Sequence, residues 1–156
     1  MKHAFTVGPV SLDDTQLRAL LMLHLAGMHE NSPPDAVFAL DLSGLAVPEL
    51  TMLGAWAGDR LAAMGALKLL GDGQGEVKSM RTHPDFLRQG AAAALLEAII
   101  AQARGKGLTR LSLETGSGDT FEPALALYRR RGFVSGEAFG DYTASAFNQF
   151  LHLPLN

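Results

Sequence analysis

Residues 77–93 constrain the fold of this chain most strongly. An alternating stretch that predicts a strand runs into Arg88-Gln89-Gly90-Ala91-Ala92-Ala93, a turn that opens directly into a predicted helix. Small residues at such a junction let a ligand approach the backbone closely. The first N–H groups of a helix have no partners inside it and lie at the positive end of its dipole. This combination suits a pyrophosphate, so we expect a nucleotide-containing cofactor here.

The composition is that of one folded domain. The 156 residues are 47% hydrophobic and 19% charged, which is typical of a globular protein, and we predict a single domain over residues 1–156. No apolar run approaches the roughly 18 residues of a membrane span, and the N-terminus lacks the apolar core of a signal peptide. The absence of cysteine excludes disulfides, thiolate metal sites and an acyl-cysteine intermediate. We therefore expect a cytoplasmic protein.

Charge and histidine spacing disfavour two further kinds of partner. The net charge of −3 argues against nucleic acid, and the histidines show no metal-ligand spacing beyond a weak His24/His29 pair, so no metal is expected. Nine Lys/Arg and five Asp/Glu lie between Lys78 and Arg131, against four and eleven in the rest of the chain. A basic segment around the small-residue turn fits an anionic cofactor, although each cation alone is explained equally well as a solvated helix-end charge.

Hydrophobic periodicity predicts an α+β fold with mixed strand pairing. The expected helices are one of about 17 residues after an N-cap at Ser11, a short one over 35–42, and two over 90–103 and 121–131. The expected strands cover 4–10, 51–57, 61–70, 76–82 and 108–114, with two more β segments from Phe133 onward. Residues 51–82 would form an antiparallel meander, and one strand–helix–strand crossover follows it.

Two motifs carry a family resemblance. The first is Leu87-Arg88-Gln89-Gly90-Ala91-Ala92 after Thr82-His83-Pro84, and the second is Ala124-Leu125-Ala126-Leu127-Tyr128-Arg129-Arg130-Arg131-Gly132-Phe133. On these residues the chain resembles the GNAT family of N-acetyltransferases across essentially its whole length, and a bacterial subgroup that acts on small molecules. The first motif departs from the family pattern at Leu87, where Gln or Arg is usual. Backbone N–H groups should still hold the phosphates, and Arg88 could compensate.

The resemblance implies a fold, a co-substrate and a set of cofactor contacts. The fold would be a central, mixed, mostly antiparallel twisted sheet of six to seven strands with about four helices on both faces. The co-substrate would be acetyl-CoA, its pantetheine arm lying where the strands ending near Thr82 and Glu114 splay apart. The residues implied in cofactor binding are Met80, Thr82, Leu87, Arg88, Gln89, Gly90, Ala91, Ala92 and Ala93. The backbone N–H near Met80 would also act in catalysis, as donor to the acetyl carbonyl.

The reaction requires a base, because amines with a pKa near 10 are mostly charged at neutral pH. Glu76 stands where the resemblance places a general base, and a period of two puts Glu76, Lys78, Met80 and Thr82 on one strand face. Glu114 is the rival candidate for the base. The simpler interpretation of Glu76 is that it is an ordinary carboxylate at the end of a strand. Tyr128 would be the general acid that reprotonates the thiolate of CoA, unless it is only a core aromatic residue.

The acceptor side is less defined by the sequence. His24, Met28 and Ser32 are candidates for lining an acceptor groove, together with Glu114, Asp141 and Tyr142, while a packing role for His24 and a structural turn at Asp141 are the simpler interpretations. We expect acetyl transfer to a primary amine of a small molecule, directly in a ternary complex, since no Ser/His/Asp pattern is apparent. The alternatives are a non-catalytic acyl-CoA-binding module and a protein N-acetyltransferase. The resemblance also makes a homodimer plausible, with the C-terminal strands as its seam.

Overall fold

One seven-stranded mixed sheet organises the protein. The computed structural model describes residues 4–155, and the strands pair in the order β1-β2-β3-β4-β5-β7-β6, antiparallel except for the parallel β4–β5 pair. The strands are β1 (Thr6–Pro9), β2 (Leu50–Ala57), β3 (Arg60–Gly71), β4 (Gln74–Thr82), β5 (Arg110–Thr115), β6 (Val134–Ser135) and β7 (Gln149–Pro154). The α-helices are α1 (Thr15–Asn31), α2 (Leu42–Leu45), α3 (Ala91–Gly105) and α4 (Glu122–Arg131), and three 3₁₀ turns cover Pro34–Ala36, Pro84–Phe86 and Asp119–Phe121.

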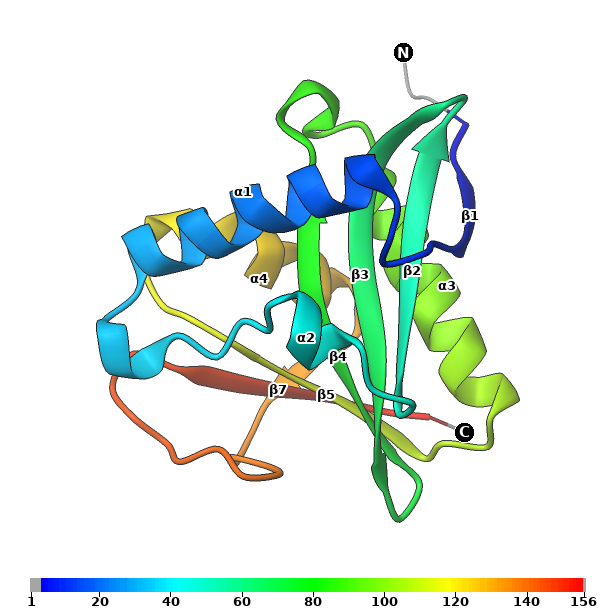
Figure 1. Cartoon of the computed structure of the whole chain (residues 1–156). Helices are drawn as coiled ribbons and strands as arrows, with labels where there is room; N and C mark the ends of the chain where they lie inside the picture. The colour runs from blue at the N-terminus through cyan, green and yellow to red at the C-terminus, as the bar shows by residue number, and fades with distance from the viewer. Residues whose placement is uncertain (1–3, 156) are drawn as a thin grey trace.

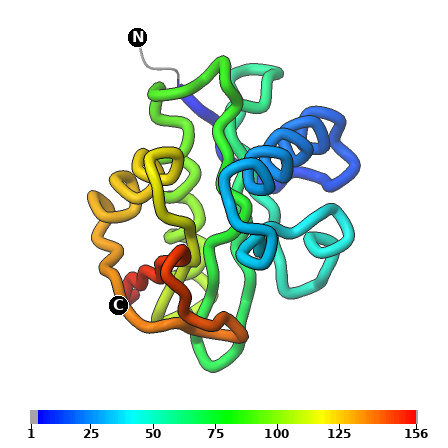
Figure 2. Tube along the Cα trace, turned by 90° about the vertical axis from the view of Figure 1, so that its left-hand side faces the viewer, coloured from blue at the N-terminus to red at the C-terminus, as the bar shows by residue number. Residues whose placement is uncertain are grey.

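The helices form one layer on each side of the sheet (Figures 1 and 2). The apolar stripe of α3 packs on one face, and with side chains of α4 it covers the larger core, which includes Leu95, Ile99 and Leu125. Helix α1 packs on the other face through Leu17 and Leu20 over a smaller core. This arrangement confirms the predicted α+β sheet with helices on both faces. Within residues 4–155 no helix has the length and apolarity needed to cross a bilayer.

Two expectations for the N-terminal third were wrong. Asp14, rather than Ser11, caps α1, because its carboxylate accepts hydrogen bonds from the N–H groups of Gln16 and Leu17 at 2.8 and 3.0 Å. The helix expected over 35–42 is absent from this part of the described chain. A 3₁₀ turn begins at Pro34, and α2 starts only at Leu42, where the Asp41 side chain caps it.

Strands β4 and β5 separate soon after they meet, as Figure 1 shows. Their ladder contains only three pairs, from Gln74–Arg110 to Glu76–Ser112. Beyond Glu76, no described strand pairs with β4 on its β5 side, so Val77–Thr82 presents free backbone groups there. The splay implied by the family resemblance is therefore present in this chain.

A β-bulge at Ser79 corrects the expected facing of β4. Met64 pairs with Arg81 and Ala66 with Lys78, so Gly65 alone lies opposite Ser79 and Met80, and Ser79 has a φ of 58°. The extra residue reverses the alternation. Glu76 and Lys78 face α1, whereas Met80 packs in the larger core beneath α3. Gly65 permits this, because a Cβ there would collide with the sulfur of Met80. The four residues expected on one face thus lie on two.

Candidate functional site

The turn after β4 presents unpaired backbone donors. Arg88 and Gly90 have left-handed backbone conformations, with φ values of 61° and 90°. Such a conformation turns neighbouring N–H groups toward a common point. Gly90 is the N-cap of α3 and offers no side chain to its first-turn N–H groups, and nothing lies within 4 Å of a Cβ built on it. The turn can therefore receive a phosphate at the N–H groups of Ala91, Ala92 and Ala93.

The side chains around this turn leave it open. Leu87 is 55% exposed, and Arg88 is exposed without an ion pair to the described residues. The Gln89 amide donates to the Asp85 carbonyl at 3.3 Å. Ala91 is buried and seats the helix in the core. The structure thus brings the expected cofactor residues together at the end of β4, with Arg88 as the free cation.

A polar cluster lies on the other side of the splay, on the sheet face toward α1. Glu76 is 4% exposed, and its Oε2 accepts hydrogen bonds from Lys78 Nζ at 3.1 Å and from the Tyr142 hydroxyl at 2.5 Å. The Tyr142 hydroxyl also accepts one from Lys78 Nζ at 2.6 Å. Burial raises the pKa of Tyr142, and the charge of Glu76 adds to this effect. One oxygen of the Glu76 carboxylate, Oε2, and the Lys78 ammonium are therefore engaged with each other and with the Tyr142 hydroxyl inside the protein.

Glu114 shares this face and has a different environment. It follows Leu113 on β5 and pairs with Phe150 of β7, and it is half-buried rather than enclosed. The pKa of Glu114 is raised to about 7, mainly by burial; the charge of Lys78 lowers it, the charge of Glu76 raises it, and a hydrogen bond with Asn148 lowers it. A carboxyl group with such a pKa can take up and release a proton at neutral pH.

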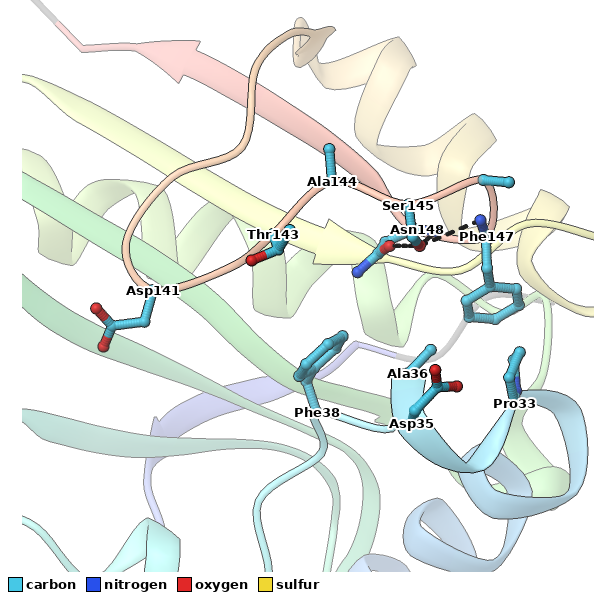
Figure 3. Close-up of a pocket in the computed structure, with 11 residues that line it drawn as sticks. Pro33, Asp35, Ala36, Phe38, Asp141, Thr143, Ala144, Ser145, Phe147 and Asn148 are labelled. Carbon is cyan, nitrogen blue, oxygen red and sulfur yellow. Dashed lines mark hydrogen bonds between the residues drawn. The ribbon is translucent and has the colours of Figure 1, made fainter.

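A groove of about 550 Å³ lies beside this cluster. Segment 33–38 forms one wall and segment 141–148 the other, and Figure 3 shows Phe38 pointing toward Thr143 and Asn148 across it. The groove is connected to the cluster through Asn148, which bonds to Glu114, and through Phe38, whose ring meets that of Tyr142 edge-on at 5.2 Å. A small ligand in this groove would therefore contact residues that themselves touch Glu114 and Tyr142.

The remaining predicted acceptor residues occupy different positions. His24 is buried in α1, where its Nδ1 accepts a hydrogen bond from Arg81 Nε at 3.1 Å, and burial followed by the charge of Arg81 lowers its pKa to about 4. Met28 packs against the larger core. Ser32 follows α1 with its Oγ buried and unpaired among the described residues. Asp141 lines the groove. His24 is thus buried and hydrogen-bonded to Arg81 rather than among the residues that line the groove.

Tyr128 lies on the opposite face of the sheet, in the larger core. Its side chain is 6% exposed, and its ring meets that of Phe133 at 5.8 Å. The hydroxyl forms no hydrogen bond with the described residues, and burial raises the pKa of Tyr128. The group therefore stays protonated at neutral pH and has a proton to donate.

The sequence did not single out several residues that the structure places at the site. Lys78, Phe38 and Asn148 were not predicted, although the alternation of Glu76 and Lys78 along a strand could have suggested their pairing. Nothing in the local sequence indicates Asn148, because its contact with Glu114 depends on how the chain returns to β7. Among residues 4–155, no three His, Asp or Glu side chains are grouped to hold a metal ion.

Comparison with known proteins shows which sequences this chain is similar to. Residues 16–133 match the sequence model of the Acetyltransferase (GNAT) family. The uncharacterized N-acetyltransferase YedL of Escherichia coli (strain K12) is 42% identical over 97% of this chain and 95% of its own length. The uncharacterized N-acetyltransferase YsnE of Bacillus subtilis (strain 168) is 47% identical over 85% of this chain and 90% of its own.

Solved structures show the same fold. A Klebsiella pneumoniae protein, provisionally described as an acyl-CoA N-acyltransferase, superposes with a TM-score of 0.82 at 29% identity, over 97% of this chain and 98% of its own. A Bacillus subtilis acetyltransferase in complex with CoA superposes with a TM-score of 0.73 at 19% identity, over 98% of this chain and all of its own.

Proposed function

Because this chain belongs to the acetyltransferase (GNAT) family and is an acyltransferase, we propose that it moves an acetyl group from acetyl-CoA to the primary amine of a small molecule. The observation that carries this proposal is the free edge of β4. It runs from Val77, next to the buried cluster, to Thr82, and the chain then continues through the 3₁₀ turn Pro84–Phe86 to the open N–H groups after Gly90.

The residues present fit acetyl-CoA. When bound, it supplies the acetyl group as an activated thioester. The N–H groups of Ala91, Ala92 and Ala93 would hold its diphosphate, with Arg88 adding charge, and the free backbone of Met80 and Thr82 would pair with the pantetheine arm. The bulge at Ser79 takes the backbone near Met80 out of the regular ladder, which frees its N–H for the acetyl carbonyl.

Glu114 is the better-placed general base. The charge of Glu76 is already paired with the Lys78 ammonium, and its Oε2 accepts hydrogen bonds from that ammonium and from a phenol. Glu114 has a single neutral donor, Asn148, and a pKa near the working pH. Glu114 would take the proton of the ammonium, and the neutral nitrogen would then attack the carbonyl carbon. The C–N bond would form and the C–S bond break, the departing thiolate would take a proton from Tyr128, and the second proton of the nitrogen would pass through water to replace it.

Direct transfer in a ternary complex is the proposed route. The sequence contains no cysteine. Ser112 does bond to His152 at 2.7 Å, but it is completely buried, so it cannot receive an acyl group from a bound thioester. The proposed acceptor lies in the groove between segments 33–38 and 141–148, whose wall includes the rings of Phe38 and Phe147 beside Asp35 and Asp141. This lining suits a small amine with an apolar part.

The proposal extends to a cytoplasmic homodimer with the C-terminal strands at its seam. In its support, β6 is a short edge strand whose Val134 is 60% exposed. Light scattering would measure the mass in solution, and a monomer at micromolar concentration would refute the assembly.

The test is acetyl-CoA turnover with a panel of small amines, followed as release of free thiol. We expect at least one amine to raise thiol release well above the amine-free rate, with intersecting initial-velocity lines, and the product to carry one acetyl group by mass spectrometry. Parallel lines would refute direct transfer. Tight acetyl-CoA binding with no turnover on any amine would favour a binding module, and acetylation of peptides alone would favour a protein N-acetyltransferase.

A further inference from the structure

Lys78 is a buried cation without a task in the reaction described above. Its side chain is 10% exposed and that of Glu76 is 5% exposed, so this ion pair is largely removed from water. Burying two charges costs free energy that their attraction only partly repays, and removing one partner leaves the other uncompensated. Such an arrangement needs a reason beyond stability.

The pair is completed by a side chain from a distant segment. The Tyr142 hydroxyl donates to Glu76 and accepts from Lys78, which closes a three-membered ring of hydrogen bonds between β4 and segment 141–148. Phe38 and Phe139 enclose the Tyr142 ring edge-on at 5.2 and 5.1 Å. Segment 141–148 forms one wall of the groove, so this ring of bonds fixes where that wall stands relative to β4.

The hydrogen-bonded group of Lys78, Glu76 and Tyr142 also sets the charge around Glu114. From β4, Lys78 lowers and Glu76 raises the pKa of Glu114, with Lys78 the larger influence. From β7, His152 is engaged by Ser112 and by the carbonyl of Glu137. On the α1 side, His24 is occupied by Arg81. The charged partners that act on Glu114 are therefore the two members of the β4 ion pair.

We propose that Lys78 and Tyr142 are positioning residues for the acetyl transfer: they hold Glu76 through its Oε2 in a hydrogen-bonded ion pair, so that Glu114, which forms no ion pair with the described residues, takes the proton, and Tyr142 holds the groove wall in place. This inference rests on the proposed function. It assigns Lys78 and Tyr142 no contact with the reacting atoms, and it treats Glu76 as part of the frame around the base.

The experiment measures the titration of Glu114 directly, by NMR of protein carrying ¹³C-labelled glutamate carboxyls, without any substrate. The signal lost in Glu114→Gln identifies the residue. We expect Lys78→Met to raise the midpoint of this signal by roughly one pH unit, Lys78→Arg to leave it near the wild-type value, and Glu76→Gln to lower it. Glu76→Gln is isosteric, so it keeps the test decisive if Lys78→Met fails to fold.

Kinetics with the accepted amine provide the second readout. The acid limb of the kcat/KM profile should move with the NMR midpoint in each variant. Tyr142→Phe should raise KM for the amine about tenfold, while leaving acetyl-CoA affinity unchanged by calorimetry. Midpoints that do not move in either Lys78→Met or Glu76→Gln, or an unchanged amine KM in Tyr142→Phe, would overturn the inference. If the midpoints move as expected but no amine is acetylated, the proposed function fails while the electrostatic role of Lys78 stands.

Discussion

Replacing Glu114 with Gln should change how the stability of the folded protein depends on pH. The glutamine keeps the shape of the side chain and the possibility of a hydrogen bond with Asn148 but cannot ionise. In the native protein, burial raises the pKa of Glu114 from 4.5 to about 7. Glu114 therefore binds a proton more tightly in the folded than in the unfolded chain, and this difference is a contribution to the free energy of unfolding.

The sign and size follow from the two pKa values. Between pH 4.5 and 7 the folded state holds more protons than the unfolded state, so this contribution is fully present below pH 4.5 and is lost as pH rises through 7. At 1.36 kcal/mol for each pH unit, the loss amounts to about 3 kcal/mol. Wild type should therefore become less stable relative to Glu114→Gln by about this amount between pH 4.5 and 8.

Urea unfolding at several pH values measures the difference, provided each transition is two-state with a constant m-value. Glu49→Gln is the matched control for the chemical change itself, because Glu49 is exposed before β2. Parallel curves for Glu114→Gln and wild type over this range would refute the claim that burial controls Glu114, and with it the choice of Glu114 as the base.

Three further outcomes follow from the structure. Gly90→Glu should abolish acetyl-CoA binding by calorimetry, because its carboxylate enters the open space before the N–H groups of α3; Gly90→Ala carries the same backbone strain at a φ of 90° without the negative charge and should weaken binding less, and equal affinities for all three proteins would contradict the phosphate site. Tyr128→Phe should lower kcat about tenfold or more with little change in KM, and full turnover across pH would remove its role as acid. Asp14→Ala should cost about 1 kcal/mol in urea unfolding, because two N–H groups of α1 lose their acceptor.

The cofactor half of the site could be predicted because its signals are local. A strand, a small-residue turn and a helix follow one another in residues 77–93, and the unpaired N–H groups of a helix start are a property of any helix. The left-handed conformation of Gly90 agrees with this expectation. The facing of β4 could not be predicted in the same way, because the bulge at Ser79 depends on Gly65 of the neighbouring strand and on the sulfur that packs over it.

The acceptor half depends on contacts between distant parts of the chain. Tyr142 bonds to Lys78 and Glu76, which lie 64 and 66 residues away in the sequence. Phe38, on the opposite wall of the groove, contacts the aromatic ring of Tyr142. No pattern within one segment specifies such meetings; they follow from the sheet order that brings β7 beside β5. For the same reason the sequence, which favoured Glu76 over Glu114 as the base, could not show that Glu76 is held in an ion pair with Lys78.

The division between a local and a distributed half bears on how the acceptor is selected. The proposed phosphate site would use backbone N–H groups of one continuous segment, so substitutions in the groove walls should leave it intact. The groove walls come from segments 33–38 and 141–148, which lie outside the helices and the sheet ladder except for the 3₁₀ turn at Pro34. Loops carried on a rigid scaffold tolerate sequence change. A substitution at Phe38 should therefore alter which amine is accepted, while one at Lys78 should alter how every amine loses its proton. Measuring kcat/KM for several amines across pH in both variants separates these two effects, and a uniform loss in both would contradict the division.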